Sequence, residues 1–278
     1  MDYLIGKPTL IKYSADKVND DKPIIFLNDD KFDIQFVALN PLIGEIICKK
    51  GEPSAKVAEY YLVKQDDEIY ICSPSFKSES EELIEGVDIL KPEHKYLRIA
   101  KPEDVLIMVS DIIENLIRRK VPQNQIDIIV DQFLKNCFKK AYIGIHDQNN
   151  ENFGILYRGI GDASIAPLYD LDLGFNVPME FNPNIDMKLK TILDSIINTL
   201  KSPNFLPNYI STIGKKYTWF DCWVKGFVNN IRDIDLGKIL LEEKQIELKP
   251  EQISHYMDFI KSQNAIIDQY FLRVSGQR

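Results

Sequence analysis

The stretch from Ile143 to Phe175 most constrains how this 278-residue chain can fold. It holds a loop rich in acids and amides, a short apolar run over residues 153–157, a Gly-Ile-Gly segment, and a second run that ends at Asp170. Glycines between two β-prone runs are typical of a hairpin turn. The sequence therefore predicts a β-hairpin that returns Asp170 to the side of Asn152.

The spacing of polar residues in this stretch indicates chemistry. Asp147 and Asn152 are five positions apart, as are the carboxylate that orients the acceptor hydroxyl and the amide that holds Mg²⁺ in a protein-kinase catalytic loop. A polar surface turn is the alternative, because the loop is rich in Asp and Asn. The returning Asp170 favours a metal–phosphate site, since carboxylate and amide oxygens can share one cation. Asp172 points to the same side of an extended segment and is an alternative or second ligand.

The rest of the chain is expected to be β-rich first and helical afterwards, as in an α+β protein. Short β-prone runs bounded by polar turns precede about residue 100, and apolar residues at helical spacing follow it. We predict strands at residues 9–13, 23–27, 57–64 and 68–72, and helices at residues 40–50, 102–117, 125–140, 185–200, 217–231 and 252–272. This order predicts a β-rich nucleotide-binding lobe over residues 1–95 and a helical lobe over residues 96–278.

Composition excludes some classes of protein and sets the compartment. A net charge of -8 argues against binding to nucleic acid through a basic face. No apolar run is long enough to span a bilayer, and the first residues do not read as a signal peptide, so we expect a cytoplasmic protein with no membrane association. The four scattered cysteines suit a reducing compartment and make no zinc motif.

Two further groups of side chains are expected to be structural. The lysines and arginines of the helical region are expected on solvated helix faces, because the chain as a whole is acidic. The aromatic residues near position 220 are expected in the core of the helical lobe. The cations are Arg118, Arg119, Lys120, Lys135, Lys139 and Lys140, and the aromatic residues are Trp219, Phe220 and Trp223.

The central motif resembles a known family. Asp147 and Asn152 followed by Phe-Gly-Ile-Leu, and then Ala-Pro-Leu-Tyr-Asp ending at Asp170, are similar to the catalytic core of HipA-like serine/threonine kinases. The compact kinase fold of that family is related to the phosphatidylinositol 3-/4-kinases. The resemblance implies a two-lobed, protein-kinase-like fold with a small β-rich N-terminal lobe and a larger helical C-terminal lobe. It also implies ATP and Mg²⁺ as cofactors, Asp147 as the catalytic base, and Asn152 and Asp170 as Mg²⁺ ligands.

The N-terminal region resembles the same family more loosely. Residues 6–12 are similar to the strand that carries the ATP-phosphate lysine, which makes Lys12 the candidate. Residues 38–47 are similar to the following helix, in which Glu45 would pair with Lys12 as kinases require. The resemblance puts residues 69–74 at the hinge whose backbone binds adenine, with Ile71 and Ser73 as the candidates.

The resemblance implies a kinase that phosphorylates Ser or Thr of a protein, with the chain itself among the candidate substrates. It also suggests the toxin of a toxin–antitoxin system, with an antitoxin-like partner and no direct contact with nucleic acid. Two departures matter: Gln148 and Asn149 stand where the family commonly has Arg-His, and only five residues precede Gly6, so most of a Gly-rich loop is expected to be missing. They motivate one alternative, a degenerate kinase-fold protein that binds a nucleotide or a partner. A small-molecule or lipid kinase is another, because one fold hosts several activities.

Overall fold

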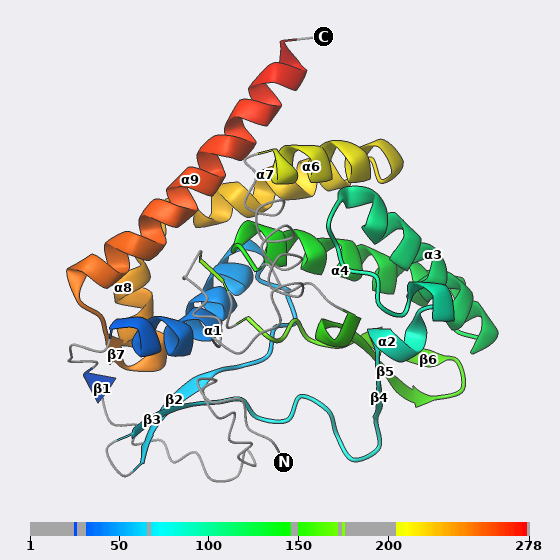
Figure 1. Ribbon diagram of the computed structural model, residues 1–278, viewed down its shortest axis with the longest axis horizontal. Helices are drawn as coiled ribbons and strands as arrows, with labels where there is room; N and C mark the ends of the chain where they lie inside the picture. The colour runs from blue at the N-terminus through cyan, green and yellow to red at the C-terminus, as the bar shows by residue number, and fades with distance from the viewer. Residues whose placement is uncertain are drawn as a thin grey trace, which may run out of the picture.

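The protein is an α+β structure in which helices dominate, and its computed structural model describes residues 25–26, 32–65, 68–145, 150–171, 174–175 and 204–276 (Figure 1). The strands are β1 (Ile25–Phe26), β2 (Tyr61–Gln65), β3 (Glu68–Cys72), β4 (Glu82–Glu85), β5 (Gly154–Gly159), β6 (Asp162–Ile165) and β7 (Ile246–Glu247). The helices are α1 (Phe32–Gly51), α2 (Gly86–Ile89), α3 (Pro102–Arg118), α4 (Gln123–Tyr142), α6 (Phe205–Lys216), α7 (Phe220–Ile231), α8 (Leu236–Ile239) and α9 (Pro250–Ser275). Shorter 3₁₀ or π-helical turns are η2 (Pro92–His94), η3 (Asn150–Asn152) and η4 (Leu240–Lys244).

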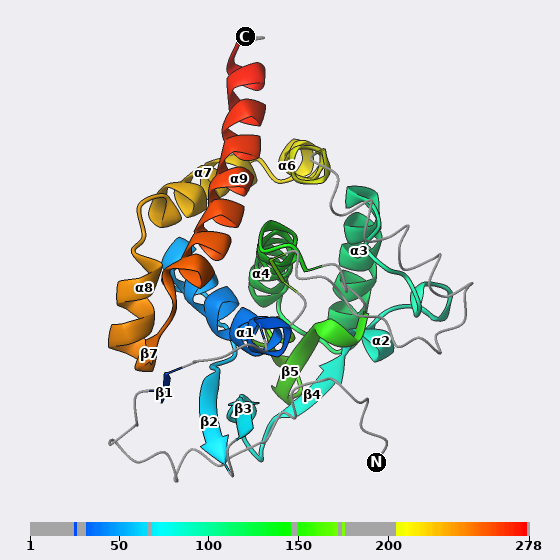
Figure 2. The same cartoon turned by 60° about the vertical axis from the view of Figure 1, so that its left-hand side comes forward.

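Helix α4 lies at the centre of the helical body, with α1, α3, α6 and α9 around it (Figure 2). Its buried residues recur at helical spacing, among them Phe133, Leu134 and Phe138. The ring of Phe138 makes edge-on contacts with Phe220 at 6.0 Å and with Trp223 at 5.4 Å between centroids. Phe220 is fully buried and Trp223 is half-buried, so the prediction that the aromatic residues near position 220 belong to the core is confirmed.

Helix α1 is longer than the sequence predicts. It begins at Phe32 rather than at Asn40 and continues through Pro41, although a proline inside a helix removes a donor and crowds the preceding turn. The side chains of Leu42 and Ile46 are buried in the common core, and this burial offsets the local cost of the proline. The helix ends at Gly51, as predicted, where a Cβ atom would lie 2.2 Å from the ring of Phe227.

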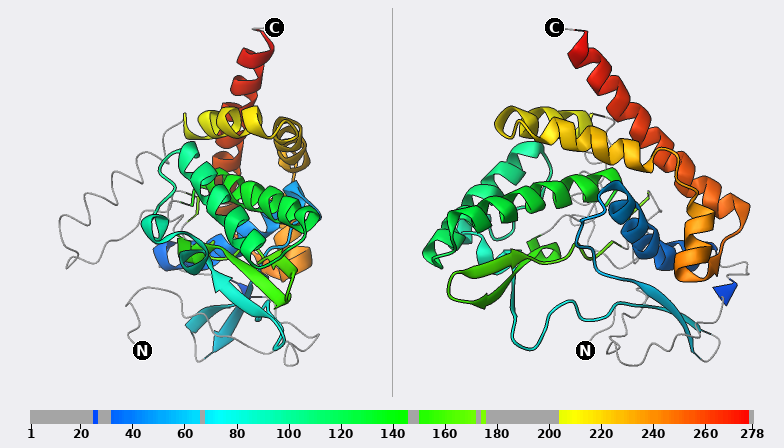
Figure 3. Two further views of the ribbon diagram at one scale, coloured as in Figure 1. Left: turned by 90° about the vertical axis from the view of Figure 1, so that its right-hand side faces the viewer. Right: turned by 180° about the vertical axis from the view of Figure 1, so that it is seen from behind.

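The strands form three small sheets. β2 pairs antiparallel with β3, β5 lies between β4 and β6, and β1 pairs parallel with β7. Both panels of Figure 3 show the β2–β3 hairpin on the opposite side of the molecule from α6 and α7. The prediction for residues 68–72 is confirmed by β3, whereas the strand predicted at residues 57–64 is shorter, with Val57 making only an isolated bridge to Leu168.

Strand β4 and helix α6 are among the elements that were not predicted. Strand β4 follows a polar segment with no β signal of its own and depends on its pairing with β5. Helix α6 contains a proline and a glycine, which weaken helix propensity, yet Phe205, Tyr209 and Ile213 recur at helical spacing and are buried. The predicted strand at residues 9–13 and the predicted helix at residues 185–200 lie outside the described residues.

One hydrophobic core joins residues from Leu39 in α1 to Ile267 in α9. The division into a lobe of residues 1–95 and a lobe of residues 96–278 stays a prediction. Among the helices of the described ranges, none is both long enough and apolar enough to cross a membrane.

Candidate functional site

The predicted hairpin is formed by β5 and β6. Ile155 pairs with Ile165, and beyond the last ladder pair the N–H of Ala166 donates to the carbonyl of Gly154 at 2.9 Å. Asn152 lies two residues before β5, so the hairpin brings the segment that carries Asp170 back to the same end. The hydroxyl of Tyr169 donates to the carbonyl of Glu151 at 2.8 Å, which ties the two ends together.

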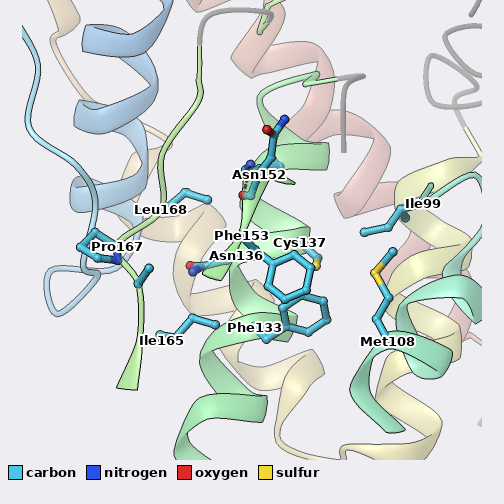
Figure 4. A pocket seen from close by; sticks show the side chains of 12 residues that line it. Ile99, Met108, Phe133, Asn136, Cys137, Asn152, Phe153, Ile165, Pro167 and Leu168 are labelled. Carbon is cyan, nitrogen blue, oxygen red and sulfur yellow. Dashed lines mark hydrogen bonds between the residues drawn. The ribbon is translucent and has the colours of Figure 1, made fainter. Parts of the chain in front are cut away.

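Asn152 is half-buried at the end of η3 and lines a small cavity of about 30 Å³ between the hairpin and helices α3 and α4 (Figure 4). The ammonium group of Lys140 donates to the carbonyl of Asn152 at 2.7 Å and lies 5.7 Å from the ring centre of Tyr169. Lys140 and Lys139 are both buried, so the prediction of solvated side chains is wrong for these two lysines. Each ammonium group has a specific partner in the interior, which sequence composition does not reveal: Glu52 for Lys139 and the backbone of Asn152 for Lys140.

Asp170 lies in the left-handed backbone region, with φ at 59°, a conformation that Asp tolerates better than most residues. Its N–H donates to the hydroxyl of Tyr60 at 3.1 Å. Just before it, Leu168 accepts from the N–H of Ala58 and donates to the carbonyl of Lys56, both at 2.8 Å. The segment that carries Asp170 is thus fixed along residues 56–60.

The chain beyond Asp170 is anchored as well. Leu171 is fully buried, and the carbonyl of Gly174 accepts from the side-chain amide of Asn40 at 3.1 Å. The N–H of Phe175 donates to the carbonyl of Ile143 at 2.6 Å. The region before the predicted catalytic loop and the region after Asp170 are therefore held against each other.

Three of the candidate site residues lie outside the described residues: Lys12, Asp147 and Asp172. The described residues on either side of positions 146–149 are fixed. Ile145 donates its N–H to the carbonyl of Lys140 at 2.9 Å. The side-chain amide of Asn150 donates to the carbonyls of His94 and Lys95 at 3.1 and 2.9 Å.

Glu45 lies in α1 and is 3% exposed. Lys49 donates to its Oε1 atom at 2.8 Å, and Oε2 accepts from the ammonium group of Lys244 and the N–H of Tyr60, both at 2.8 Å. Lys244 also donates to the carbonyl of Tyr60 at 3.0 Å. Tyr60 therefore contacts Glu45 through its backbone and Asp170 through its hydroxyl, while the pairing of Glu45 with Lys12 stays a prediction.

The hinge candidates lie at the end of the β2–β3 hairpin. Ile71 is in β3 and pairs with Leu62, and Ser73 follows the strand directly. The hydroxyl of Ser73 donates to the carbonyl of Pro74 at 3.4 Å. Binding of adenine by this backbone stays a prediction.

Acidic groups surround the end of the hairpin. Burial raises the pKa of Tyr169, and the nearby carboxylates of Glu85 and Asp170 raise it further. Within the described part of the chain, no three His, Cys, Asp or Glu side chains gather as they would around a metal ion. The amide oxygen of Asn152 and the carboxylate of Asp170 are nonetheless hard oxygen donors, which is the donor chemistry that Mg²⁺ takes in proteins.

Three residues of this region were not found from the sequence. Lys140 carries a usable signal, since it is three residues after Cys137 and seven after Phe133 and so shares their buried helix face. Tyr60 and Lys244 carry none, because each acquires its partners from segments far away in the sequence.

The fold is similar to that of a kinase. The crystal structure of the Helicobacter pylori proinflammatory kinase CtkA matches 97% of this chain and 99% of that chain, with a TM-score of 0.58 and 14% identity. HipA of Shewanella oneidensis MR-1, from a toxin–antitoxin system and solved with HipB and its operator DNA, matches 84% of this chain and 56% of that chain, with a TM-score of 0.44 and 13% identity. No family model matches the chain, and neither does any curated protein sequence. The resemblance to HipA-like kinases that the central motif carries is confirmed at the level of the fold.

Proposed function

We propose that this protein is an ATP- and Mg²⁺-dependent kinase that transfers phosphate to a Ser or Thr hydroxyl of a protein. One observation carries the proposal: in a chain with a kinase fold, a single hairpin brings Asn152 and the segment of Asp170 to one end. Kinase chemistry needs these two oxygen ligands close together and on a rigid support.

The residues have distinct roles in this proposal. Asp147 orients the acceptor hydroxyl and takes its proton, and Asn152 and Asp170 hold Mg²⁺, with Asp172 as a second carboxylate. Lys12 binds the ATP phosphates, and the backbone near Ile71 and Ser73 receives adenine. When bound, Mg²⁺ neutralises charge on the phosphates.

The described neighbours of the site keep its donors in place. Lys140 holds the backbone of Asn152 at 2.7 Å, and Tyr60 holds the backbone of Asp170 at 3.1 Å. A backbone that is fixed before the cation arrives limits the positions of the ligand side chains, which reduces the entropy lost when they bind it. This rigidity supports the assignment of both residues as metal ligands.

The direct test is phosphate transfer from radiolabelled ATP by the Asp147→Ala and Asp170→Asn variants. Asn tolerates the left-handed backbone at position 170, so the second variant should keep its fold. Each variant should lose at least about a hundredfold in rate, because each removes a group that acts on the reacting atoms. Asp258→Asn, at a side chain with 69% exposure, is the matched control and should keep full activity. Undiminished transfer by Asp147→Ala would contradict the proposal.

A second candidate is a kinase-fold protein that binds a nucleotide or a partner without robust catalysis. One observation favours it: both oxygens of Glu45 already accept from Lys49, Lys244 and Tyr60. An active kinase needs this glutamate to pair with the lysine that binds the phosphates. A rise in melting temperature with ATP and Mg²⁺, together with no incorporation of phosphate into any protein, would favour this candidate over the first.

The expected partners follow from the proposed activity. We propose a protein substrate, with the chain itself as one candidate, and an antitoxin-like protein that controls it, in the cytoplasm. These expectations depend on the resemblance of the central motif to HipA-like kinases. Copurification of the protein with the product of a neighbouring gene, and inhibition of phosphate transfer by that product, would test the antitoxin expectation.

A further inference from the structure

The C-terminal end of α3 lies near the turn between β5 and β6 (Figure 1). Residues of both segments line an open groove of about 590 Å³. Its wall includes three consecutive cations, Arg118, Arg119 and Lys120, together with Tyr157 and Ile160. Asn152 lies at the other end of strand β5. Since a strand rises by about 3.3 Å per residue, the groove extends from roughly 10 Å, at Tyr157, to roughly 17 Å, at Gly159, from the start of β5. It shares no lining residue with the cavity beside Asn152 and is distinct from the candidate kinase site.

The groove carries positive charge in a chain whose net charge is -8. No carboxylate of the described residues forms an ion pair with the three consecutive cations, whereas the fourth cation of the wall, Arg158, is paired with Glu81 at 2.7 Å. The carboxylate of Glu82 also lines the groove. The C-terminal end of a helix carries about half a negative charge, and Glu82 adds one more. The three consecutive cations exceed this negative charge, so the groove is positive overall.

The cations lie on a rigid corner. The guanidinium group of Arg119 lies 4.4 Å from the ring centre of Tyr157, which is buried and donates its hydroxyl to Asn115 at 3.2 Å. Lys120 has a φ of 60°, and its carbonyl lies so close to Gly161 that a Cβ atom there would be 3.0 Å from it. These contacts fix the side chain of Arg119 and the backbone of Lys120, and a fixed backbone reduces the entropy that a ligand must offset on binding.

An apolar side chain adjoins the cations. Ile160, at the tip of the hairpin, is 91% exposed and lines the same groove. Beside the cations, this single side chain can add one apolar contact to a ligand whose carboxylates bind the cations.

We propose that this groove binds an acidic segment of a protein partner, with carboxylates on Arg118 and Lys120 and an apolar side chain against Ile160. Guanidinium groups bind carboxylates through paired, charge-assisted hydrogen bonds. The volume of the groove is within the range of pockets that hold small ligands. The overall acidity of the chain opposes the long phosphate backbone of a nucleic acid, whereas a short acidic segment needs only the local positive charge.

The test is a binding measurement on the full chain, so it does not depend on kinase activity. The probe is a fluorescein-labelled peptide of sequence EEELEEE, followed by fluorescence anisotropy at low salt. The groove variant is Arg118→Gln/Lys120→Gln, which leaves Arg119 in place against Tyr157. The matched control is Lys215→Gln/Lys216→Gln, because α6 also ends in two exposed lysines and Lys216 lies 5.7 Å from the ring centre of Tyr217.

The groove variant should raise the Kd for the peptide by about tenfold or more, and the control by less than about twofold. Ile160→Ser should weaken binding of EEELEEE but not of EEEEEEE. Equal losses in the groove variant and the control would overturn the proposal, as would a wild-type protein that does not bind the probe. Competition with a single-stranded oligonucleotide gives a further outcome. The proposal would also be overturned if the oligonucleotide displaced the labelled peptide at a lower concentration than unlabelled peptide does.

Discussion

The N–H of Asp170 donates to the hydroxyl of Tyr60 at 3.1 Å, although 110 positions separate the two residues. The N–H of Tyr60 in turn donates to Glu45 at 2.8 Å. One tyrosine therefore contacts both Glu45, which is predicted to pair with the phosphate-binding lysine, and the backbone of Asp170, whose carboxylate is proposed to hold Mg²⁺. The position of Asp170 depends on this contact.

Replacing Tyr60 by Phe should weaken metal binding more than it weakens the fold. Outer partners of metal ligands typically contribute about tenfold or more to affinity. Tyr60→Phe should therefore raise the Mg²⁺ concentration for half-maximal ATP binding by about tenfold. The control is Tyr61→Phe, which removes a hydroxyl bonded to Glu59 at 2.8 Å, and it should leave that concentration unchanged. The same Mg²⁺ dependence in both variants would count against a role for Tyr60.

Replacing Lys140 by Met should destabilise the protein. The change keeps most of the buried stem but removes the charged donor to Asn152, and such hydrogen bonds contribute about 1.5–3 kcal/mol. Urea unfolding followed by circular dichroism measures the loss. Lys261→Met, at a lysine with 68% side-chain exposure, should change little. A loss no larger than that of the control would show that the contact with Asn152 is energetically minor.

The buried pair of Glu52 and Lys139, with 2.6 Å between Oε2 and Nζ, predicts a pH dependence of stability. Burial alone would raise the pKa of Glu52, but Lys139 and Lys135 together hold it below its usual value. A carboxyl with a lowered pKa contributes stability above its unfolded pKa of 4.5, and this contribution is lost as the pH falls through the folded pKa.

At pH 7, Glu52→Gln should therefore lower the free energy of unfolding by about 3–5 kcal/mol, because the variant leaves a buried ammonium group without its counterion. The difference in unfolding free energy between the wild type and this variant should shrink as the pH falls below about 4.5. Urea midpoints measured from pH 7 to pH 3.5 test both parts. Glu52→Gln/Lys139→Met should recover much of the loss, and a deficit that stays constant with pH would contradict the assignment.

Gly86 predicts a packing constraint next to the site. A Cβ atom there would lie 2.1 Å from the ring of Phe153 and 2.5 Å from the carbonyl of Asn150. Gly86→Ala should destabilise the protein by about 1–3 kcal/mol through overpacking. Gly226→Ala, in α7 with no atom within 4 Å of the added carbon, should stabilise it by about 0.5–1 kcal/mol. The two variants should move the thermal midpoint in opposite directions, and a shift of the same sign would contradict the packing argument.

Much of the fold was predictable because it depends on local pattern. Periodic apolar residues located α3, α4, α7 and α9, and the two glycines between apolar runs located the β5–β6 hairpin. Helix α1 was predicted too short, and strand β4 was not predicted. Helix α1 continues through Pro41 because its side chains are buried in the core, and strand β4 depends on its pairing with β5.

The sequence by itself determined the hairpin, the spacing that leads from Asn152 to Asp170, and the resemblance to a kinase. Chain connectivity and turn chemistry act over a few residues and can be read locally. Only the tertiary structure decided three contacts. The hydroxyl of Tyr60 accepts from the N–H of Asp170, the ammonium group of Lys140 donates to the carbonyl of Asn152, and that of Lys244 donates to Glu45. The partners in these contacts come from separate elements. The helix face of Lys140 indicates burial but not its acceptor, and the local pattern around Tyr60 or Lys244 indicates neither.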